Sequence, residues 1–326
     1  MFGRTRSTSA RRLIMRAAAI DIGTNTVRLL IVEAVGTSVE TVVRDQVITR
    51  LGEGVGKSGL ILPEAATRTL EVLLGYLRRC RESKVSRTVV TGSAVLRDAA
   101  NAEEFVNRVR GETGLAVDIL SGEGEARLSY AGVASGRQEG PLVVIDLGGG
   151  STELVFGKGS EVISAASINV GSVRLTEQYL HSDPPTGSEQ AELVEYARST
   201  VAPHARRILT AAGRWRHKLE AAGVGGTITT LSAINLDLAI YDRVRVHHSA
   251  LTVEILDRVL DRLARMKLHE RKQVRGLQPE RADVIIGGIL IVRETLRALG
   301  LDGLWVSESD LLDALATSVL MPIADN

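Results

Sequence analysis

The chain has 326 residues, enough for about two domains, and a formal net charge of +1 at pH 7. Aromatic residues make up only 3%, which does not favour nucleic-acid binding by base stacking, and no apolar run is long enough to span a membrane. A single cysteine, Cys80, excludes a disulfide framework and favours a reducing cytoplasm as the setting.

Charge is unevenly distributed along the chain. Residues 1–16 contain five arginines and no acid, whereas residues 201–281 contain fifteen Lys and Arg against eight Asp and Glu. Residues 1–15 lack the apolar stretch of a secretory signal, so we expect a disordered tail or a passive extension, with Met15 as an alternative start.

The first half of the chain predicts a meander of three short strands, a long helix opened by Pro63, and then alternating strands and helices. In chain order, the strands are at 17–21, 27–33, 41–48, 88–92 and 117–120, and the helices are at 63–80, 102–112 and 124–133.

The second half repeats this pattern and then becomes mostly helical. The predicted strands are at 142–146, 153–156, 162–167 and 304–307, and the predicted helices are at 187–212, 228–238, 251–268, 281–299 and 310–320. Residues 21–26 and 146–152 follow the same order: an apolar strand ending in Asp, then glycine and hydroxyl residues, then another strand. We therefore predict two related α/β domains facing each other across an active-site cleft, at residues 16–130 and 131–326.

The two repeated turns are typical of phosphate binding. Glycine lets backbone N–H groups point into a concavity, hydroxyl groups add donors, and a nearby carboxylate can hold a divalent cation. A single Asp-Gly turn is also a common hairpin connector, but two copies at domain spacing favour a shared ligand. The predicted phosphate-binding residues are Gly23, Thr24, Asn25, Thr26, Gly148, Gly149, Gly150, Ser151 and Thr152, and the carboxylates are Asp21 and Asp146.

Five further residues have two interpretations each. Glu153 either completes an acidic metal site or is a solvated strand residue, and Glu125 either orients a water or caps a helix. Arg97 either holds a phosphate or pairs with Asp98. Gly226 and Thr227 either face a phosphate or ribose from a helix N-terminus or form a helix entry without a ligand.

Together, these motifs resemble those of the exopolyphosphatase/guanosine pentaphosphate phosphatase family, in the actin/sugar-kinase/heat-shock ATPase superfamily. The resemblance covers residues 16–320. The motifs that carry it are, in order, residues 21–29, 91–97, 121–127, 145–154 and 225–227.

The resemblance implies two ribonuclease-H-like domains and release of a terminal phosphate with the help of Mg²⁺, or of Mn²⁺ in its place. It implies that Glu125 is the catalytic base and that Asp146 and Glu153, with Asp21 nearby, are the metal carboxylates. It also implies phosphate contacts from Arg97 and both turns, and a homodimer. The expected substrate is inorganic polyphosphate or guanosine pentaphosphate, with neither nucleic acid nor membrane as a partner. We expect a chain that leaves the cleft to run along the basic segment 201–281.

The chain departs from the family pattern at three places: Gly124 replaces a glutamate, Gly287-Gly288 replaces Pro-Gly, and Leu312 replaces an arginine. It also stops where long members continue, so it is similar to the short form. Exopolyphosphatase activity is the main prediction. The alternatives are a guanosine pentaphosphate 5′-phosphohydrolase, a low-turnover sensor of guanosine tetra- or pentaphosphate, and a sugar kinase, which the motif at 121–127 does not favour.

Overall fold

The computed structural model describes residues 15–36, 38–135 and 140–320. The predicted tail therefore lies outside the described residues, apart from Met15, whose carbonyl accepts a hydrogen bond from the N–H of Ala34. Within the described part, no helix is long and apolar enough to cross a membrane.

The first sheet has five strands in the order β3-β2-β1-β4-β5. Strands β1, β2 and β3 are antiparallel neighbours, while β4 and β5 extend the sheet in parallel from β1. The strand bounds are β1 Arg16–Ile22, β2 Thr26–Val35, β3 Ser38–Ile48, β4 Arg87–Gly92 and β5 Asp118–Ile119.

The second sheet repeats this topology and adds one strand. Its order is β8-β7-β6-β9-β11-β10, with the same antiparallel meander followed by parallel strands, and β10 pairs antiparallel at the edge. The bounds are β6 Pro141–Leu147, β7 Thr152–Lys158, β8 Glu161–Ile168, β9 Glu220–Val224, β10 Ala250–Thr252 and β11 Gly303–Val306. The predicted fold class, an α/β fold with two related halves, is confirmed.

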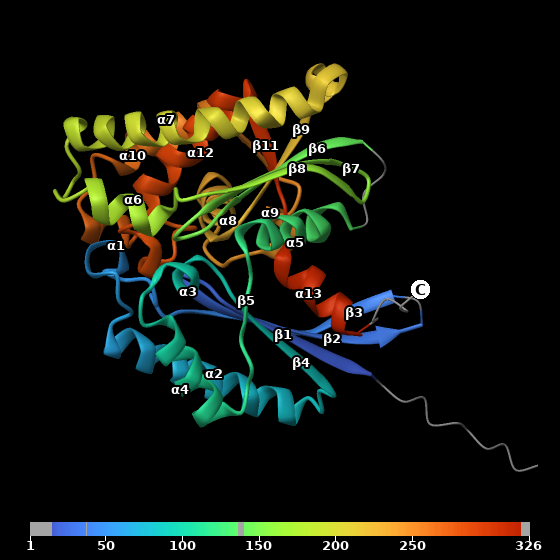
Figure 1. The fold of residues 1–326 in the computed structure, drawn as a ribbon. Coiled ribbons are helices and arrows are strands. Elements are labelled where there is room, and N and C mark those ends of the chain that lie inside the picture. Colours follow the sequence, from blue (N-terminus) through green and yellow to red (C-terminus); the bar gives the residue numbers. More distant parts are fainter. Residues whose placement is uncertain (1–14, 37, 136–139, 321–326) are drawn as a thin grey trace, which may run out of the picture.

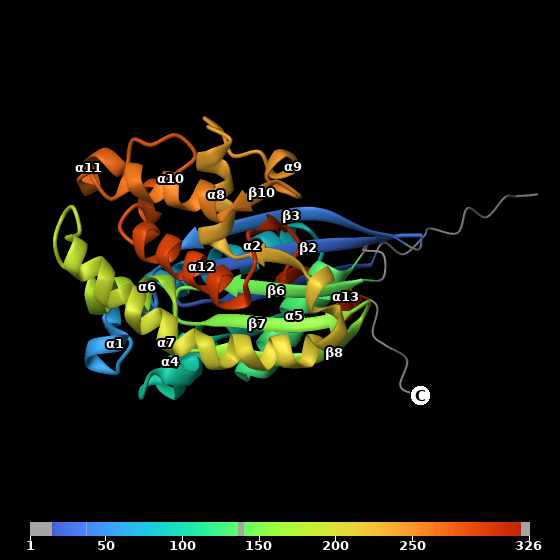
Figure 2. The same cartoon turned by 90° about the horizontal axis from the view of Figure 1, so that it is seen from above.

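The sheets and helices form five layers (Figure 1). Helices α2 (Pro63–Glu82) and α4 (Ala102–Thr113) cover the outer face of the first sheet, and α7 (Gly187–Ala212) and α12 (Ile285–Leu299) cover the outer face of the second. Figure 2 shows α7 running across the second sheet. Between the two sheets lie α5 (Gly122–Ala134) and α13 (Leu311–Leu320), packed against each other.

Each of the two central helices packs on the sheet of the other half of the chain. Helix α5 buries Ala126 and Tyr130 against β6, β7 and β9, whereas α13 buries Leu312 and Leu315 against β1 and β2. The division expected at residue 130 stays a prediction, but the helix packing crosses it in both directions. Leu312, where the family pattern has an arginine, is 1% exposed and contributes to this apolar packing.

Most of the other helices are short. Their bounds are α1 Val55–Ser58, α3 Ala94–Asp98, α6 Ser172–Tyr179, η1 Gly213–Lys218, α8 Gly226–Asn235, α9 Arg243–Val246, α10 Val253–Leu263, α11 Leu268–Arg271 and η2 Pro279–Arg281. The region 251–268, predicted as one helix, is instead β10 followed by α10, and the chain leaves the helix before α11. Helix α6 is not among the predicted elements.

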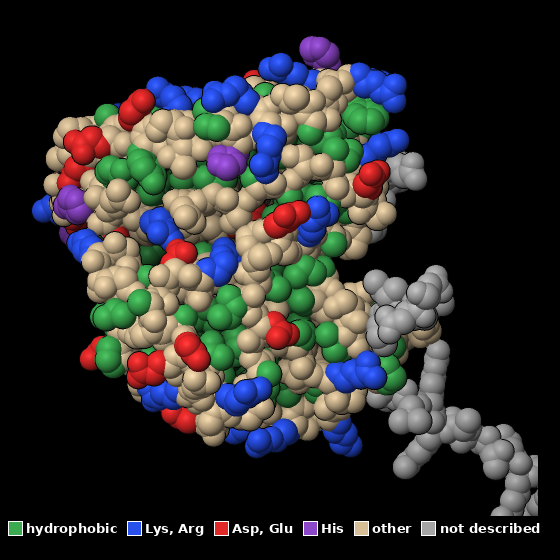
Figure 3. Space-filling model, in the orientation of Figure 1, with side chains coloured by type: hydrophobic (Ala, Val, Ile, Leu, Met, Phe, Trp, Pro, Cys, Tyr) green, Lys and Arg blue, Asp and Glu red, His purple; other side chains and the backbone are tan. Residues whose placement is uncertain are grey.

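The basic segment 201–281 is divided between two surfaces. Its first part belongs to the end of α7 and to η1, on the outer side of the molecule, where Figure 3 shows Lys and Arg side chains gathered. Arg243 and Arg281, by contrast, line cavities between the two halves. Only part of the segment is therefore placed to contact an anion in the cleft.

Candidate active site

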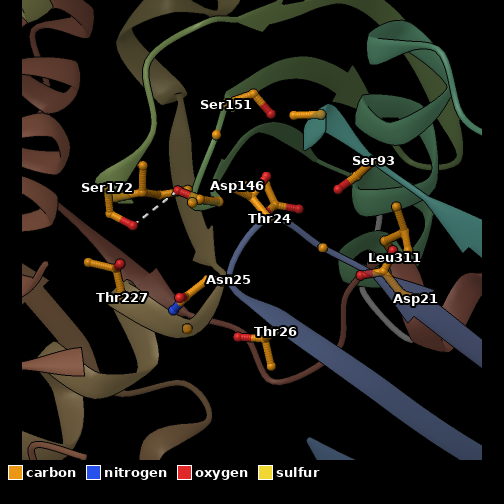
Figure 4. A pocket seen from close by; sticks show the side chains of 18 of the residues that line it. Asp21, Thr24, Asn25, Thr26, Ser93, Asp146, Ser151, Ser172, Thr227 and Leu311 are labelled. Atoms are coloured by element: carbon orange, nitrogen blue, oxygen red, sulfur yellow. Dashed lines mark hydrogen bonds between the residues drawn. The ribbon is translucent and has the colours of Figure 1, made fainter. Parts of the chain in front are cut away.

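A pocket of about 80 Å³ lies where the carboxyl ends of β1 and β6 meet. Two turns contribute to its wall: loop 1, residues 23–26 after β1, and loop 2, residues 148–151 after β6. Figure 4 shows Ser172 and Thr227 on one side of the pocket and Asp21 and Ser93 on the other. The structure thus brings together both turns that the sequence predicted.

The two loops have the same internal hydrogen bond. In loop 1 the Gly23 N–H donates to the Thr26 carbonyl over 3.0 Å, and in loop 2 the Gly148 N–H donates to the Ser151 carbonyl over 3.0 Å. Both turns have this hydrogen bond because both halves have the same order of residues: a strand ending in Asp, a turn and then another strand.

The carbonyls of both loops accept hydrogen bonds from neighbouring segments of the chain. The Gly52 N–H donates to the Thr24 carbonyl, and the N–H groups of Thr49 and Arg50 both donate to the Asn25 carbonyl. In loop 2, the N–H groups of Ser172 and Val173 donate to the carbonyls of Gly148 and Gly149. The Arg174 Nε donates to the Gly150 carbonyl over 2.8 Å.

Each loop also has N–H groups without an acceptor among the described residues. Within the described part of the chain, the N–H groups of Thr24 and Asn25 in loop 1, and of Gly149 and Gly150 in loop 2, donate to no other residue. Successive unpaired N–H groups in a turn form an anion-binding concavity. The pocket therefore offers two such concavities to one ligand.

A third wall comes from the N-terminus of α8. Gly225 adopts φ +96°, and a Cβ there would lie 2.5 Å from the Leu147 carbonyl, so only glycine fits without strain. A Cβ on Gly226 would lie 2.2 Å from the guanidinium of Arg281. Arg281 is buried at the pocket wall, and burial, together with the nearby Arg28, lowers its pKa to about 10.

Asp21 is held by its neighbours in the first half. One carboxylate oxygen accepts from Arg28 over 2.8 Å, and the other accepts from the Thr91 hydroxyl over 3.3 Å. Arg28 also pairs with Asp310 over 2.5 Å. Although burial acts the other way, Asp310 and Asp21 raise the pKa of Arg28, so this cation stays charged.

Asp146 occupies the equivalent position in the second half. Its carboxylate accepts a hydrogen bond from the Ser129 hydroxyl over 2.5 Å. Burial raises the pKa of Asp146 to about 6 against the effect of that bond, and the nearby Asp310 adds to the rise. The group therefore sits in a surplus of buried negative charge that a cation would relieve.

Glu125 lines the pocket from the first turn of α5. Its carboxylate accepts from Arg97 over 2.8 Å, and Arg97 also donates to the Leu120 carbonyl over 2.8 Å. Burial raises the pKa of Glu125 to about 7, Arg97 lowers it, and Asp21 and Asp146 raise it further. A buried carboxyl with a pKa near 7 suits a general base.

Three predicted site residues do not line this pocket. Arg97 binds Glu125 instead of facing the pocket, and its other predicted partner, Asp98, pairs with Arg174. Thr152 is fully buried and donates to the Val170 carbonyl. Glu153, 1% exposed, accepts from the hydroxyls of Ser151 and Ser167, and burial raises its pKa well above the usual value.

The predicted metal carboxylates do not form a preassembled cage. Among the described residues, no group of three His, Cys, Asp or Glu side chains is arranged to hold a metal ion. Asp21 and Asp146 both line the pocket, but Asp21 accepts hydrogen bonds at both oxygens, whereas Asp146 accepts one at a single oxygen and has a raised pKa. Mg²⁺ commonly binds one or two carboxylates plus substrate phosphates, so Asp146 beside two phosphate loops fits that ion.

Comparison with known proteins identifies the family. The model of the Ppx/GppA phosphatase family matches residues 30–318. The chain belongs to the Ppx/GppA phosphatase family. This confirms the resemblance, and membership makes the chain a phosphatase, and so a hydrolase.

Several relatives and solved structures match along almost their whole length. Exopolyphosphatase 2 of Mycobacterium tuberculosis is 38% identical over 323 residues, covering 94% of this chain and 99% of that protein. The crystal structure of the Aquifex aeolicus family member is 34% identical with a TM-score of 0.77, covering 96% of this chain and 100% of that one. An exopolyphosphatase from Cytophaga hutchinsonii is 26% identical with a TM-score of 0.86, covering 94% and 98%.

Sequence reasoning missed four polar side chains in this pocket: Arg28, Ser93, Ser172 and Arg281. Arg28 was predictable, because the turn at 23–26 places it opposite Asp21 on the neighbouring strand. The same register places Glu153 opposite Asp146, so the two halves carry opposite charges at equivalent positions. No local pattern signals Arg281, which reaches the pocket only through tertiary packing.

Proposed function

We propose that the protein is an exopolyphosphatase that releases the terminal orthophosphate of inorganic polyphosphate. The observation that carries this proposal is a pair of loops whose carbonyls accept hydrogen bonds from neighbouring segments. The middle two N–H groups of each loop have no acceptor among the described residues. Two such loops suit two neighbouring phosphoryl groups of one chain. The names of the relatives from Mycobacterium tuberculosis and Cytophaga hutchinsonii support the same activity.

Binding and orientation come from the loops and from two arginines at the pocket wall. The N–H groups and the hydroxyls of Thr24 and Ser151 would hold the terminal and penultimate phosphoryl groups. Arg28, which is partly buried and paired with Asp21 and Asp310, and Arg281, which is buried, line the same pocket and would contact the phosphates. Positioning and charge complementarity account for most of the expected rate enhancement.

The reaction itself is an in-line attack of water. Glu125 accepts a proton from the water as its oxygen attacks the terminal phosphorus. The bond from that phosphorus to the bridging oxygen breaks, and the shortened chain leaves with the bridging oxygen. One nitrogen of the Arg97 guanidinium donates both to the Glu125 carboxylate and to the Leu120 carbonyl, so Arg97 fixes the position of Glu125.

Mg²⁺, or Mn²⁺ in its place, would be held by Asp146 and the substrate phosphates. The cation would offset the negative charge that develops on the phosphate oxygens. Glu153 accepts hydrogen bonds from the hydroxyls of Ser151 and Ser167, and would thereby hold Ser151 in place at the pocket wall.

A second cavity favours guanosine pentaphosphate as the alternative substrate. It encloses about 340 Å³ and adjoins the phosphate pocket at Arg28, Gly225 and Gly226. Its other arginines, Arg44 and Arg243, are paired with Asp313 and Glu308. A charge-balanced cavity of this size suits a polar nucleoside better than further phosphates.

One assay separates these activities. Phosphate release would be measured from short polyphosphate, long polyphosphate and guanosine pentaphosphate, each with and without Mg²⁺. We expect Mg²⁺-dependent release that is faster from short polyphosphate. Faster release from the pentaphosphate would favour the alternative, and tight nucleotide binding with no release from any substrate would contradict both.

The setting of the protein follows from the same proposal. We expect it to act in the cytoplasm and as a homodimer, without nucleic acid or membrane as a partner. Because only part of the basic segment 201–281 faces the cleft, the substrate would be held mainly near its end.

A further inference from the structure

Helix α6 connects loop 2 to the first half of the molecule. Its first residues donate to all three glycine carbonyls of loop 2, so the helix and the loop are fixed to each other. A Cβ on Gly171 would lie 2.3 Å from the Gly149 carbonyl oxygen, which shows how closely the two segments pack.

The same helix reaches across the cleft at two points. The Arg174 guanidinium donates to the Gly150 carbonyl through Nε and to the Asp98 carboxylate through its other end. The Glu177 carboxylate accepts the Gly54 N–H at 3.2 and 3.3 Å. Gly54 continues the segment 49–52, whose N–H groups bond the carbonyls of loop 1.

The segments that support the two loops therefore meet directly. The two loops are also in close contact with each other, because a Cβ on Gly150 would lie 2.8 Å from the Thr24 hydroxyl. The same Cβ would lie 3.1 Å from the Cβ of Ala94, at the start of α3. Asp98 ends α3, the helix that also carries Arg97, the residue that holds Glu125.

We propose that Arg174 and Asp98 are positioning residues that hold loop 2 in register with loop 1 and with the Glu125–Arg97 pair. This rests on the proposed phosphate release from a ligand that both loops bind. Neither side chain lines the phosphate pocket, so neither contacts the substrate phosphates. When the pair is removed, the substrate itself must bring the loops together, which lowers its apparent affinity.

The test compares two ion pairs of the same design. Asp98→Ala removes the carboxylate bound by Arg174 and leaves the bond from Arg174 to Gly150. Glu33→Ala is the matched control, because Arg16 binds Glu33 and the Ser83 carbonyl in the same way but within the first half. The side chains of the two pairs are similarly exposed, at 26% and 29% against 28% and 19%.

Steady-state kinetics and a distance measurement read out the effect. Spin labels at Asn107→Cys on α4 and Arg206→Cys on α7, both exposed, report the distance between the halves by pulsed electron spin resonance. We expect Asp98→Ala to raise KM about fivefold with kcat changed less than twofold, and to broaden the distance distribution without substrate. Glu33→Ala should change neither.

Unchanged KM and an unchanged distance distribution in Asp98→Ala would overturn the proposal. A lower melting temperature with reduced kcat and unaltered distances would also overturn it, since that pattern indicates a role in folding alone. If the unmodified protein releases no phosphate, the proposed function fails. The distance distributions then decide the inference by themselves.

Discussion

At the scale of single residues, the chemistry depends on how burial and charge act on Glu125. The group is buried beside Asp21 and Asp146, which disfavours its ionised form, while Arg97 favours that form. The balance leaves a pKa of about 7, where the carboxylate is both available and basic enough to accept a proton from water.

Removing this carboxylate should remove the base and leave the binding site. We expect Glu125→Gln to lower kcat by about 10²- to 10⁴-fold, the usual contribution of a general base. Glu123→Gln is the control, because Glu123 is exposed and pairs with Arg127 on the same helix. Full phosphate release by Glu125→Gln would show that another group activates the water.

The pH dependence should report the same carboxylate. Because Glu125 acts in its ionised form and its pKa is raised to about 7, kcat/KM should rise with pH and level off above that value. Arg97→Met should move the midpoint to higher pH, since Arg97 lowers the pKa of Glu125. Rate profiles at constant ionic strength would check this, and a midpoint that stays in place would argue against the pairing.

At the scale of elements, each phosphate loop works together with the segment that supports it. Residues 49–52 bond the carbonyls of loop 1, and residues 172–174 bond those of loop 2. Glycine is needed wherever such segments come within van der Waals distance of each other's backbone.

Gly171 offers a test of this support. An added Cβ would lie 2.3 Å from the Gly149 carbonyl oxygen and 2.4 Å from the Gly150 carbonyl carbon, so loop 2 would have to shift. We expect Gly171→Ala to cost about 1–3 kcal/mol of stability and at least tenfold in kcat/KM. Urea unfolding and phosphate release would measure the two effects.

Gly111→Ala is the matched control for that change. Gly111 is an exposed position in α4 with nothing within 4 Å of the added carbon. The substitution should stabilise the protein by about 0.5–1 kcal/mol and leave activity unchanged. Normal activity in Gly171→Ala would mean that loop 2 tolerates the shift.

The sequence predicts the loops well because their signals are local. Asp21 and Asp146 end apolar strands, and each is followed by glycine and hydroxyl residues within a few positions. Helix α6 and Arg281 have no such signal: an eight-residue helix gives too short a pattern, and Arg281 is placed by packing against α8. Glu153 is beside Asp146 as expected, but one of its carboxylate oxygens accepts hydrogen bonds from two serine hydroxyls.

At the scale of the whole molecule, the central helices join the two sheets. A Cβ on Gly132 of α5 would lie 1.9 Å from the Asp310 carbonyl oxygen, so the start of α13 touches the backbone of α5. Periodicity predicted both helices, but amphipathic patterns do not specify which of two sheets a helix will cover.

Shortening one side chain of α13 should weaken both halves together. Leu312 packs with Ala17, Ala19 and Leu30, so Leu312→Ala should cost about 2–4 kcal/mol. Urea unfolding would be followed by circular dichroism and by the fluorescence of the two tryptophans, Trp215 and Trp305, both in the second half. Coincident shifts in both signals are expected, and a fluorescence transition that does not move would show that the halves unfold separately.

Because each central helix packs on the sheet of the other half, the first sheet lacks one of its covering helices during most of synthesis on the ribosome. All five strands of the first sheet are made before residue 120, but the helix that covers one of its faces is made only after the second sheet is complete. Until residues 311–320 emerge, Ala17, Ala19, Leu30 and Val32 have no cover from α13. The nascent first half is thus left with an open apolar face, which is the kind of surface that chaperones bind during translation.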